Sequence, residues 1–333
     1  MKIVQIGGAG HAFYAYGAIK RHGFDFAALS CGSHGIEAEG TENTLAALKK
    51  NGFAPKLYSD WRQMLDAEEP DIAIVNPWFN DIAACAVGAL ERGINVFCEK
   101  PLASSLDELG KLEYAVGHSD AKLGAMLETR YEPAFRAAKK AIAEGKIGEI
   151  RLMDSRKSYK LGVRPGFYSS RETYCGILPW VAIHAIDWMK WLSGESYTAV
   201  TAAHSSRANF GNGDMDITSA ALFTMTNEVI ASVTADMLRP SKAATHGDDR
   251  VRVVGTKGIL EITDGAVTLL SDEVGGKITL DNEPPADIFE DFLGIINGEP
   301  SELTAGSAIE STRWALMARD YADRALSEKR RSE

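Results

Sequence analysis

The chain has 333 residues, of which 45% are hydrophobic and 25% are charged, and its formal net charge is −10. This length exceeds the size at which a single hydrophobic core usually keeps growing, so we expect two domains. The acidic balance argues against nucleic acid and anionic membrane surfaces as partners, because both require a basic patch.

The sequence predicts a cytoplasmic protein with reduced thiols and no metal site. The segment MKIVQIGG enters a strand pattern at once and lacks the pattern of a signal peptide, and no apolar stretch is long enough to span a bilayer. The cysteines, at positions 31, 85, 98 and 175, show neither CxxC nor metal-ligand spacing.

Residues 1–127 alternate short strand-like runs with longer segments of helical spacing. Strands are expected over 2–6, 24–30, 71–76, 94–99 and 122–127. Helices are expected over 12–22, 41–51, 60–68, 80–92 and 105–118. This alternation predicts a domain of parallel βαβ units with a doubly wound sheet, whose ligands bind at the carboxyl ends of the strands.

Residues 128–333 have a different pattern and are assigned to a second, α+β domain. Period-two alternation appears in EIRLMDSRKSY, TSAALFTMT, VIASVTADML, RVRVVG, GILEIT and AVTLL. Turn signals such as GNGD and GTKG separate these runs, which predicts a mainly antiparallel sheet. Helices are expected over 132–145, 179–192, 287–298 and 306–330, the second of them packed on one face of the sheet.

The segment IGGAGHAF directly follows the first expected strand and opens a helix. Gly8 and Gly10 allow a tight turn and close approach of a pyrophosphate, whose charge the start of a helix favours. Phe13 stands where the third glycine of the dinucleotide fingerprint would fall, so an ordinary glycine-rich turn is the alternative. The candidate cofactor residues of this turn are Gly8, Ala9, Gly10, His11 and Ala12.

The second expected strand ends in LSCGSHG, with Ser30 as a further candidate cofactor residue. An acid that selects NAD is usual at this point, yet no carboxylate appears before Glu37. Small hydroxyl residues and a histidine suit a 2'-phosphate, but no arginine adjoins them to bind one. The cofactor is therefore expected to be NAD or NADP, with a slight lean to NADP.

The segment VFCEKPLASS puts Glu99 and Lys100 at the carboxyl end of a buried strand. A cation there can polarise a substrate hydroxyl or carbonyl and stabilise the charge that develops on its oxygen as hydride leaves. Taken alone, the same residues also fit a surface Lys-Pro turn.

The apolar segment CGILPWVAIHAIDWMKW contains one histidine, His184. A lone histidine on such a helix is usually a core residue, but Asp187 follows at i+3 and could orient its imidazole as a general base. Trp180 shares that helix face and could stack on a sugar ring. The preceding loop offers Arg164, Tyr168 and Tyr174 as candidate substrate residues, with an ordinary solvated loop as the alternative.

In this context the EKPLA segment resembles the signature of the Gfo/Idh/MocA oxidoreductases, the family of glucose-fructose oxidoreductase and inositol dehydrogenase. PAFRAAKKAIAEGKIGEI (133–150) resembles the family's entry into its second domain, and RVRVVGTKGILEI (250–262) resembles its recurrent strand pair. The segment 176–187 is similar to the family's G-x-L-x-D-x-x-x-H-x-x-D helix. The resemblance extends along almost the whole chain.

The resemblance implies a Rossmann domain followed by a domain with a large open, mainly antiparallel sheet. It implies NAD(P)-dependent hydride transfer to or from a small sugar, cyclitol or sugar-derived substrate, with Lys100 and His184 as the catalytic residues. Asn76 and Pro77 fit the family's strand-four motif and are candidate cofactor residues. The open sheet of this family commonly pairs between subunits, so a homodimer or homotetramer is expected.

The chain departs from the family pattern at several positions. Trp78 and Asp81 stand where Asn and His are usual, Glu128 replaces an asparagine, and Trp180 replaces an aspartate one turn before the histidine. These departures leave two alternatives open. One is an NAD-dependent glycoside-cleaving enzyme that uses transient oxidation, and the other is a dinucleotide-binding sensor without catalysis.

Overall fold

The computed structural model describes residues 1–332 and divides the chain into two compact units. The first unit contains 1–126, 172–175 and 287–312, and the second unit contains 127–171, 176–286 and the chain from Arg313 on. The main division after residue 126 lies one residue from the boundary expected from the sequence. The two shorter segments of the first unit had been assigned to the second domain, and the structure differs there.

A parallel six-stranded sheet forms the centre of the first unit, with the strand order β3-β2-β1-β4-β5-β6. This order is that of a doubly wound dinucleotide-binding fold, so the expected fold class is confirmed for this unit. Its strands are β1 (Lys2–Ile6), β2 (Asp25–Ser30), β3 (Lys56–Tyr58), β4 (Ile72–Val75), β5 (Asn95–Cys98) and β6 (Leu123–Ala125). The edge strand β3 was not predicted, because its residues are largely exposed and form no apolar run.

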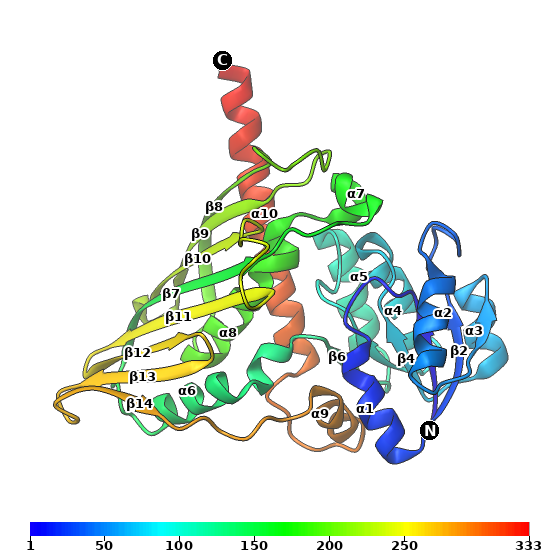
Figure 1. The fold of residues 1–333 in the computed structure, drawn as a ribbon, viewed down its shortest axis with the longest axis horizontal. Coiled ribbons are helices and arrows are strands. Elements are labelled where there is room, and N and C mark those ends of the chain that lie inside the picture. The colour runs from blue at the N-terminus through cyan, green and yellow to red at the C-terminus, as the bar shows by residue number, and fades with distance from the viewer. Residues whose placement is uncertain (333) are drawn as a thin grey trace. The chain divides into compact units, whose positions relative to one another are not determined.

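Three helices of the first unit begin at residues whose side chains cap them. The side chain of Asp60 accepts from backbone N–H groups at the start of α3, and Ser105 and Asp287 do the same for α5 and α9. The helical elements are α1 (Phe13–His22), α2 (Thr41–Lys50), α3 (Trp61–Glu68), η1 (Phe79–Asp81), α4 (Ile82–Leu90), α5 (Leu106–Gly117) and α9 (Ile288–Ile296). Figure 1 shows α2 and α3 beside β2.

Aromatic packing explains why α9 belongs to the first unit. The ring of Phe97 on β5 lies 5.1 Å from that of Phe289 and 5.4 Å from that of Phe292, centroid to centroid. A side chain at Gly124 on β6 would lie 2.4 Å from the Phe292 ring, so the glycine makes room for it. Amphipathic spacing alone predicts the helix but not which sheet its apolar face covers.

The second unit is built on an eight-stranded sheet with the order β14-β13-β12-β11-β7-β10-β9-β8. Strands β7 and β10 pair in parallel, and the other neighbours pair antiparallel, which confirms the expected mainly antiparallel sheet. The strands are β7 (Ile150–Tyr159), β8 (Tyr197–Ser205), β9 (Thr218–Met225), β10 (Ile230–Asp236), β11 (Gly247–Gly255), β12 (Gly258–Thr263), β13 (Ala266–Ser271) and β14 (Gly276–Leu280). Strands β8 and β14 were not predicted.

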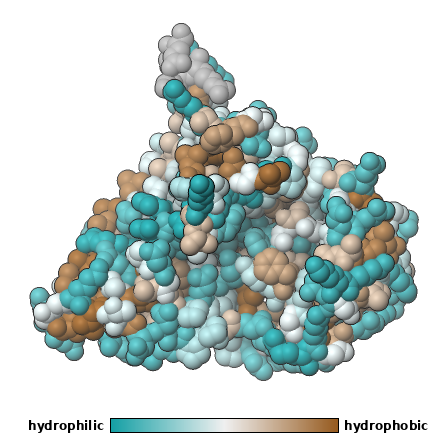
Figure 2. Space-filling model, viewed as in Figure 1, coloured by the Kyte–Doolittle hydropathy of each residue, from teal (hydrophilic) through white to brown (hydrophobic). Residues whose placement is uncertain are grey.

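Helices pack on one face of this sheet and leave apolar side chains exposed on its strands. Helix α8 contacts β7 and β10, and α6 contacts β12 and β13 (Figure 1). Leu152, Leu222, Ile230 and Leu270 are exposed, and Figure 2 shows apolar patches at its left margin, over this sheet. The helical elements are η2 (Glu128–Tyr131), α6 (Pro133–Ala143), η3 (Gly166–Ser169), η4 (Leu178–Ala182), α8 (Ile183–Ser193) and η5 (Thr226–Glu228), and both α7 (Arg171–Tyr174) and α10 (Ala305–Ser332) are divided between the units.

The helix expected over 179–192 consists of two parts. Its first turn, η4, is π-helical, and α8 continues the chain as a regular helix from Ile183. Both faces of α8 are buried, as its apolar sequence predicts. Within residues 1–332, no helix is long and apolar enough to cross a membrane.

Candidate functional site

The glycine turn of the first unit is tied to the carboxyl ends of neighbouring strands. The N–H of Gly7 donates to the carbonyl of Ser30 (2.8 Å), and the N–H of Ala9 donates to that of Asn76 (2.9 Å). The ring of Pro77 lies so close that a side chain at Gly7 would come within 2.3 Å of its Cα. The predicted cofactor residues from Gly8 to Ala12, with Ser30, Asn76 and Pro77, are therefore gathered at one edge of the sheet.

A concave surface adjoins this turn along α1 and α2. A cavity of about 630 Å³ is lined by Gly8, Gly10, Asn76 and residues of α1 and α2, including Thr44. A Cβ at Gly8 would lie 2.1 Å from the Thr44 hydroxyl, so a larger residue there would have to displace the Thr44 side chain. Helix α1 begins after Ala12, which has no side-chain acceptor for the first N–H groups of the helix. Such a helix start suits a phosphate.

Glu99 connects the glycine turn to Lys100. Its buried carboxylate accepts the backbone N–H of His11 (2.6 Å) and lies 3.0 Å from the imidazole Nδ1 of that residue, and it also accepts the N–H of Lys100 (3.0 Å). Burial alone would raise the pKa of Glu99, but His11 and Lys100 together lower it, so the carboxylate stays ionised. A Cβ at Gly10 would lie 2.0 Å from the Glu99 carboxylate, which requires glycine there. Lys100 itself is fully buried at the end of β5.

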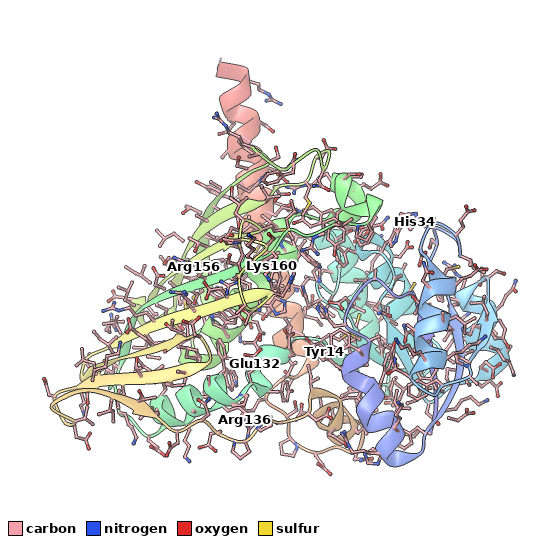
Figure 3. The ribbon with its side chains drawn as sticks, in the orientation of Figure 1. Tyr14, His34, Glu132, Arg136, Arg156 and Lys160 are labelled. Carbon is pink, nitrogen blue, oxygen red and sulfur yellow. The ribbon has the colours of Figure 1, made fainter. Side chains whose placement is uncertain are left out.

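Two carboxylates hold the loop that follows β2. Glu39 accepts the N–H groups of Gly32 (2.8 Å) and His34 (3.0 Å), and Asp81 accepts that of Ser33 (2.7 Å). Burial raises the pKa of Glu39, although these backbone bonds oppose the rise. The imidazole of His34, labelled in Figure 3, stacks on the Trp78 ring at 4.1 Å. The unusual residues at 78 and 81 therefore take part in the structure of this loop.

In the second unit, His184 lies on α8, is 1% exposed, and has a carboxylate close by. Its Nδ1 is 3.7 Å from Oε2 of Glu128 on η2. The other candidate acid, Asp187, accepts two hydrogen bonds from Arg130, from Nε at 2.7 Å and from a terminal nitrogen at 2.6 Å. Arg130 thus compensates the charge of Asp187 in a buried, bidentate ion pair.

Further charged residues, which sequence reasoning did not single out, complete this cluster. The ammonium of Lys157 on β7 donates to Asp249 on β11 at 2.6 Å. Burial opposes the charge of Lys157, but the phenol of Tyr159 and the carboxylates of Asp249 and Glu128 raise its pKa, so the ammonium persists. Burial and the nearby carboxylates Asp249 and Glu128 raise the pKa of Glu132 to about 7, although Lys157 opposes the rise. Figure 3 shows Glu132 at the start of α6.

One signal in the sequence points to Lys157. The lysine is in phase with the buried residues Met153 and Ser155, which face the helices, in the period-two pattern of β7. A charged residue in a buried phase requires a partner. The partner itself, Asp249, comes from a strand ninety-two positions later and is fixed only by the register of β7 with β11.

Aromatic rings and an arginine form a second group in this unit. The guanidinium carbon of Arg164 lies 5.3 Å from the Tyr168 ring and 5.2 Å from the Trp180 ring. Trp180 also meets Tyr168 edge-on at 5.1 Å. These candidate substrate residues are thus brought together. The remaining one, Tyr174, is fully buried and belongs to the first unit.

Comparison with protein families identifies both parts of the chain. The model described as "Oxidoreductase family, NAD-binding Rossmann fold" matches residues 1–124, and the model described as "GFO/IDH/MocA C-terminal domain" matches residues 135–261. The expectation of a nicotinamide dinucleotide cofactor, NAD or NADP, is confirmed by the first description.

Similar proteins cover the chain to different extents. A solved structure described as an oxidoreductase from Thermotoga maritima is 40% identical, covers 97% of this chain and 98% of its own, and has a TM-score of 0.92. A levoglucosan dehydrogenase in complex with NADH and levoglucosan shares the fold, with 19% identity, coverage of 97% and 98% of the two chains and a TM-score of 0.81.

Among curated proteins, an inositol 2-dehydrogenase from Burkholderia vietnamiensis is 25% identical over 220 residues, which are 66% of this chain. The match spans 62% of the length of that relative. The parallel sheet of the first unit agrees with the Rossmann-fold description of the model that matches residues 1–124. The chain belongs to the Gfo/Idh/MocA family of oxidoreductases.

Proposed function

We propose that this protein is an NAD-dependent dehydrogenase or reductase that acts on a CH-OH group or carbonyl of a sugar, cyclitol or sugar-derived compound. The observation that carries the proposal is the Glu99 carboxylate, which joins the N–H of His11 in the glycine turn to the backbone of Lys100. This connection supports a common site for the cofactor and for the lysine that meets the substrate.

The residues of this chain supply the polar chemistry. A nicotinamide dinucleotide, when bound, accepts or supplies the hydride. The Lys100 ammonium donates a hydrogen bond to the reacting oxygen and stabilises the alkoxide-like charge on it. The His184 imidazole removes the hydroxyl proton during oxidation and returns a proton during reduction.

The group of Arg164, Tyr168 and Trp180 fits the proposed substrate class. An indole ring stacks on the apolar face of a sugar or cyclitol, and a guanidinium donates to hydroxyl or carboxylate oxygens. The similar proteins named inositol 2-dehydrogenase and levoglucosan dehydrogenase support a cyclic polyol or anhydrosugar as the first compounds to test.

NAD is proposed as the preferred cofactor, in place of the slight lean to NADP from the sequence. In the loop after β2, the N–H groups of Gly32, Ser33 and His34 are already bound by the carboxylates of Glu39 and Asp81. A 2'-phosphate bound near this loop would meet negative charge without an arginine in the loop to neutralise it.

The exposed apolar residues on the eight-stranded sheet support a homodimer or homotetramer formed through that sheet. Leu222 on β9 and Ile230 on β10 are about half exposed, at 50% and 46%. Light scattering at several protein concentrations tests the oligomeric state. The cytoplasmic location expected from the sequence stays a prediction.

Thermal unfolding with NAD and with NADP, followed by a nicotinamide-coupled screen of inositols, anhydrosugars, aldoses and sugar acids, tests the proposed function. We expect a larger stabilisation by NAD and net formation of NADH with at least one cyclic polyol, because stabilisation follows ligand concentration over its dissociation constant. Release of a sugar without net NADH would instead favour glycoside cleavage. Tight NAD binding with no turnover across the panel would favour a sensor.

A further inference from the structure

A carboxylate from another element lies close to the imidazole of His184. One helical turn before His184 the chain has Trp180 and no acid. Glu128 lies on η2 and approaches His184 from there, with Oε2 3.7 Å from Nδ1.

The element that carries Glu128 is tied to the helix that carries His184. Oε2 of Glu128 is buried and has no hydrogen-bond partner within residues 1–332, so a donor that approaches it gains a hydrogen bond. Two residues further along η2, Arg130 is held by its bidentate ion pair with Asp187 on α8. Because Asp187 follows His184 by nearly one helical turn, this ion pair fastens η2 against the same part of α8.

The other candidate acid of α8 is already engaged. Asp187 is 1% exposed and receives two charge-assisted hydrogen bonds from Arg130. Releasing it to orient the imidazole would leave the Arg130 guanidinium buried without its carboxylate, which is costly. Glu128 can orient the His184 imidazole while the Arg130–Asp187 ion pair stays intact.

Charged groups from several elements surround Glu128. They are the ammonium of Lys157 and the phenol of Tyr159 from β7, Asp249 from β11, Glu132 at the start of α6, and the imidazole of His184 from α8. Among these groups Lys157, held by Asp249 at 2.6 Å, is the ammonium.

We infer that Glu128 is the positioning acid of His184. This inference rests on the proposed function. A small approach across the 3.7 Å that separates the two atoms lets Glu128 accept a hydrogen bond from Nδ1–H, and Nε2 then takes the substrate hydroxyl proton. The O–H bond breaks, the N–H bond forms on Nε2, and the carboxylate stabilises the resulting imidazolium.

The inference is tested by Glu128→Gln, with Glu144→Gln as the matched control. Glu144 is an exposed glutamate just past the end of α6, where its partner is the exposed Lys146. The first readout is an NMR titration of the ring nitrogens of His184, assigned by its loss in His184→Gln. This readout needs neither cofactor nor substrate, so it remains decisive if the proposed function fails.

We expect Glu128→Gln to lower the pH midpoint of His184 protonation by about one pH unit, because a negative charge within about 4 Å favours the imidazolium. It also weakens the preference for the Nδ1–H tautomer. Glu144→Gln leaves both unchanged. An unchanged midpoint and tautomer in Glu128→Gln would overturn the inference.

The second readout is the pH profile of kcat/KM in the oxidation direction. We expect kcat to fall about tenfold to a hundredfold with little change in KM, less than the loss from removing a general base. The acidic limb of the kcat/KM profile moves to lower pH, because the His184 imidazole stays neutral at lower pH when the carboxylate is removed. Loss of kcat with an unmoved limb and an unchanged NMR midpoint would assign Glu128 a purely structural part and overturn the inference.

Discussion

The two units build their candidate sites in different ways. In the first unit, the residues of interest follow directly on the ends of β1, β4 and β5, and Glu99 and Lys100 are adjacent in the chain. In the second unit, His184, Glu128, Lys157 and Asp249 come from separate elements and meet through sheet register and helix packing. In the parallel sheet, the site residues therefore lie in short sequence motifs at the strand ends. In the antiparallel sheet with one covered face, they come from distant parts of the sequence.

Removing the buried cation of the second unit is expected to have the largest effect. It tests whether the charged cluster of that unit stabilises the fold. Lys157→Met leaves Asp249, Glu128 and Glu132 without their shared ammonium. We expect the free energy of unfolding to fall by about 3–5 kcal/mol, the usual cost of breaking a buried ion pair. Urea denaturation at pH 7.5 measures this change. Lys146→Met, at an exposed position, is the control, and a loss below about 1 kcal/mol would show that the cluster is not held by charge.

The matching change in the first unit is Lys100→Ala. We expect kcat/KM on the best substrate of the screen to fall by about 10²–10³, because a donor to the developing oxyanion is lost. Stabilisation by NAD in thermal unfolding is expected to persist, since the glycine turn is intact. Lys111→Ala on the exposed face of α5 is the control. A variant that keeps full activity would contradict the proposed role.

Gly10→Ala tests whether the first unit depends on the close approach of Gly10 to the Glu99 carboxylate. The added methyl would lie 2.0 Å from the Glu99 carboxylate, so the carboxylate must leave His11. We expect a loss of stability of about 1–3 kcal/mol, as for overpacking, and weaker NAD binding by calorimetry. Gly110→Ala on α5, where nothing lies within 4 Å, should stabilise the helix slightly instead. Equal effects of the two changes would refute the contact.

The smallest expected effect concerns pH. The folded pKa of Glu132 is raised to about 7 from 4.5, so its contribution to stability is full below pH 4.5 and is lost as pH rises through 7. Relative to the wild type, Glu132→Gln should therefore gain roughly 1–2 kcal/mol in unfolding free energy between pH 5 and pH 8, after allowance for partial exposure. Denaturant melts at both pH values measure the difference. A difference in unfolding free energy between Glu132→Gln and the wild type that stays constant with pH would place the pKa of Glu132 near its ordinary value.

Much of the fold was predictable, because periodicity reports local structure. The strands and helices of the first unit appear close to their expected positions, and so do most strands of the second unit. Strands β3, β8 and β14 were missed. Helix α9 was predicted as an element but assigned to the wrong unit, because amphipathic spacing does not say which sheet receives Phe289 and Phe292.

By itself, the sequence determined the glycine turn, the Glu99-Lys100 pair and the candidate His184, because each depends on residues that are neighbours in the chain or on one helix. Only the tertiary structure decided that Glu128 lies beside His184, that Arg130 engages Asp187 and that Lys157 is held by Asp249. The physical reason is that a buried charge needs a partner within a few ångströms, and the partner's place in the sequence is set by how strands and helices pack.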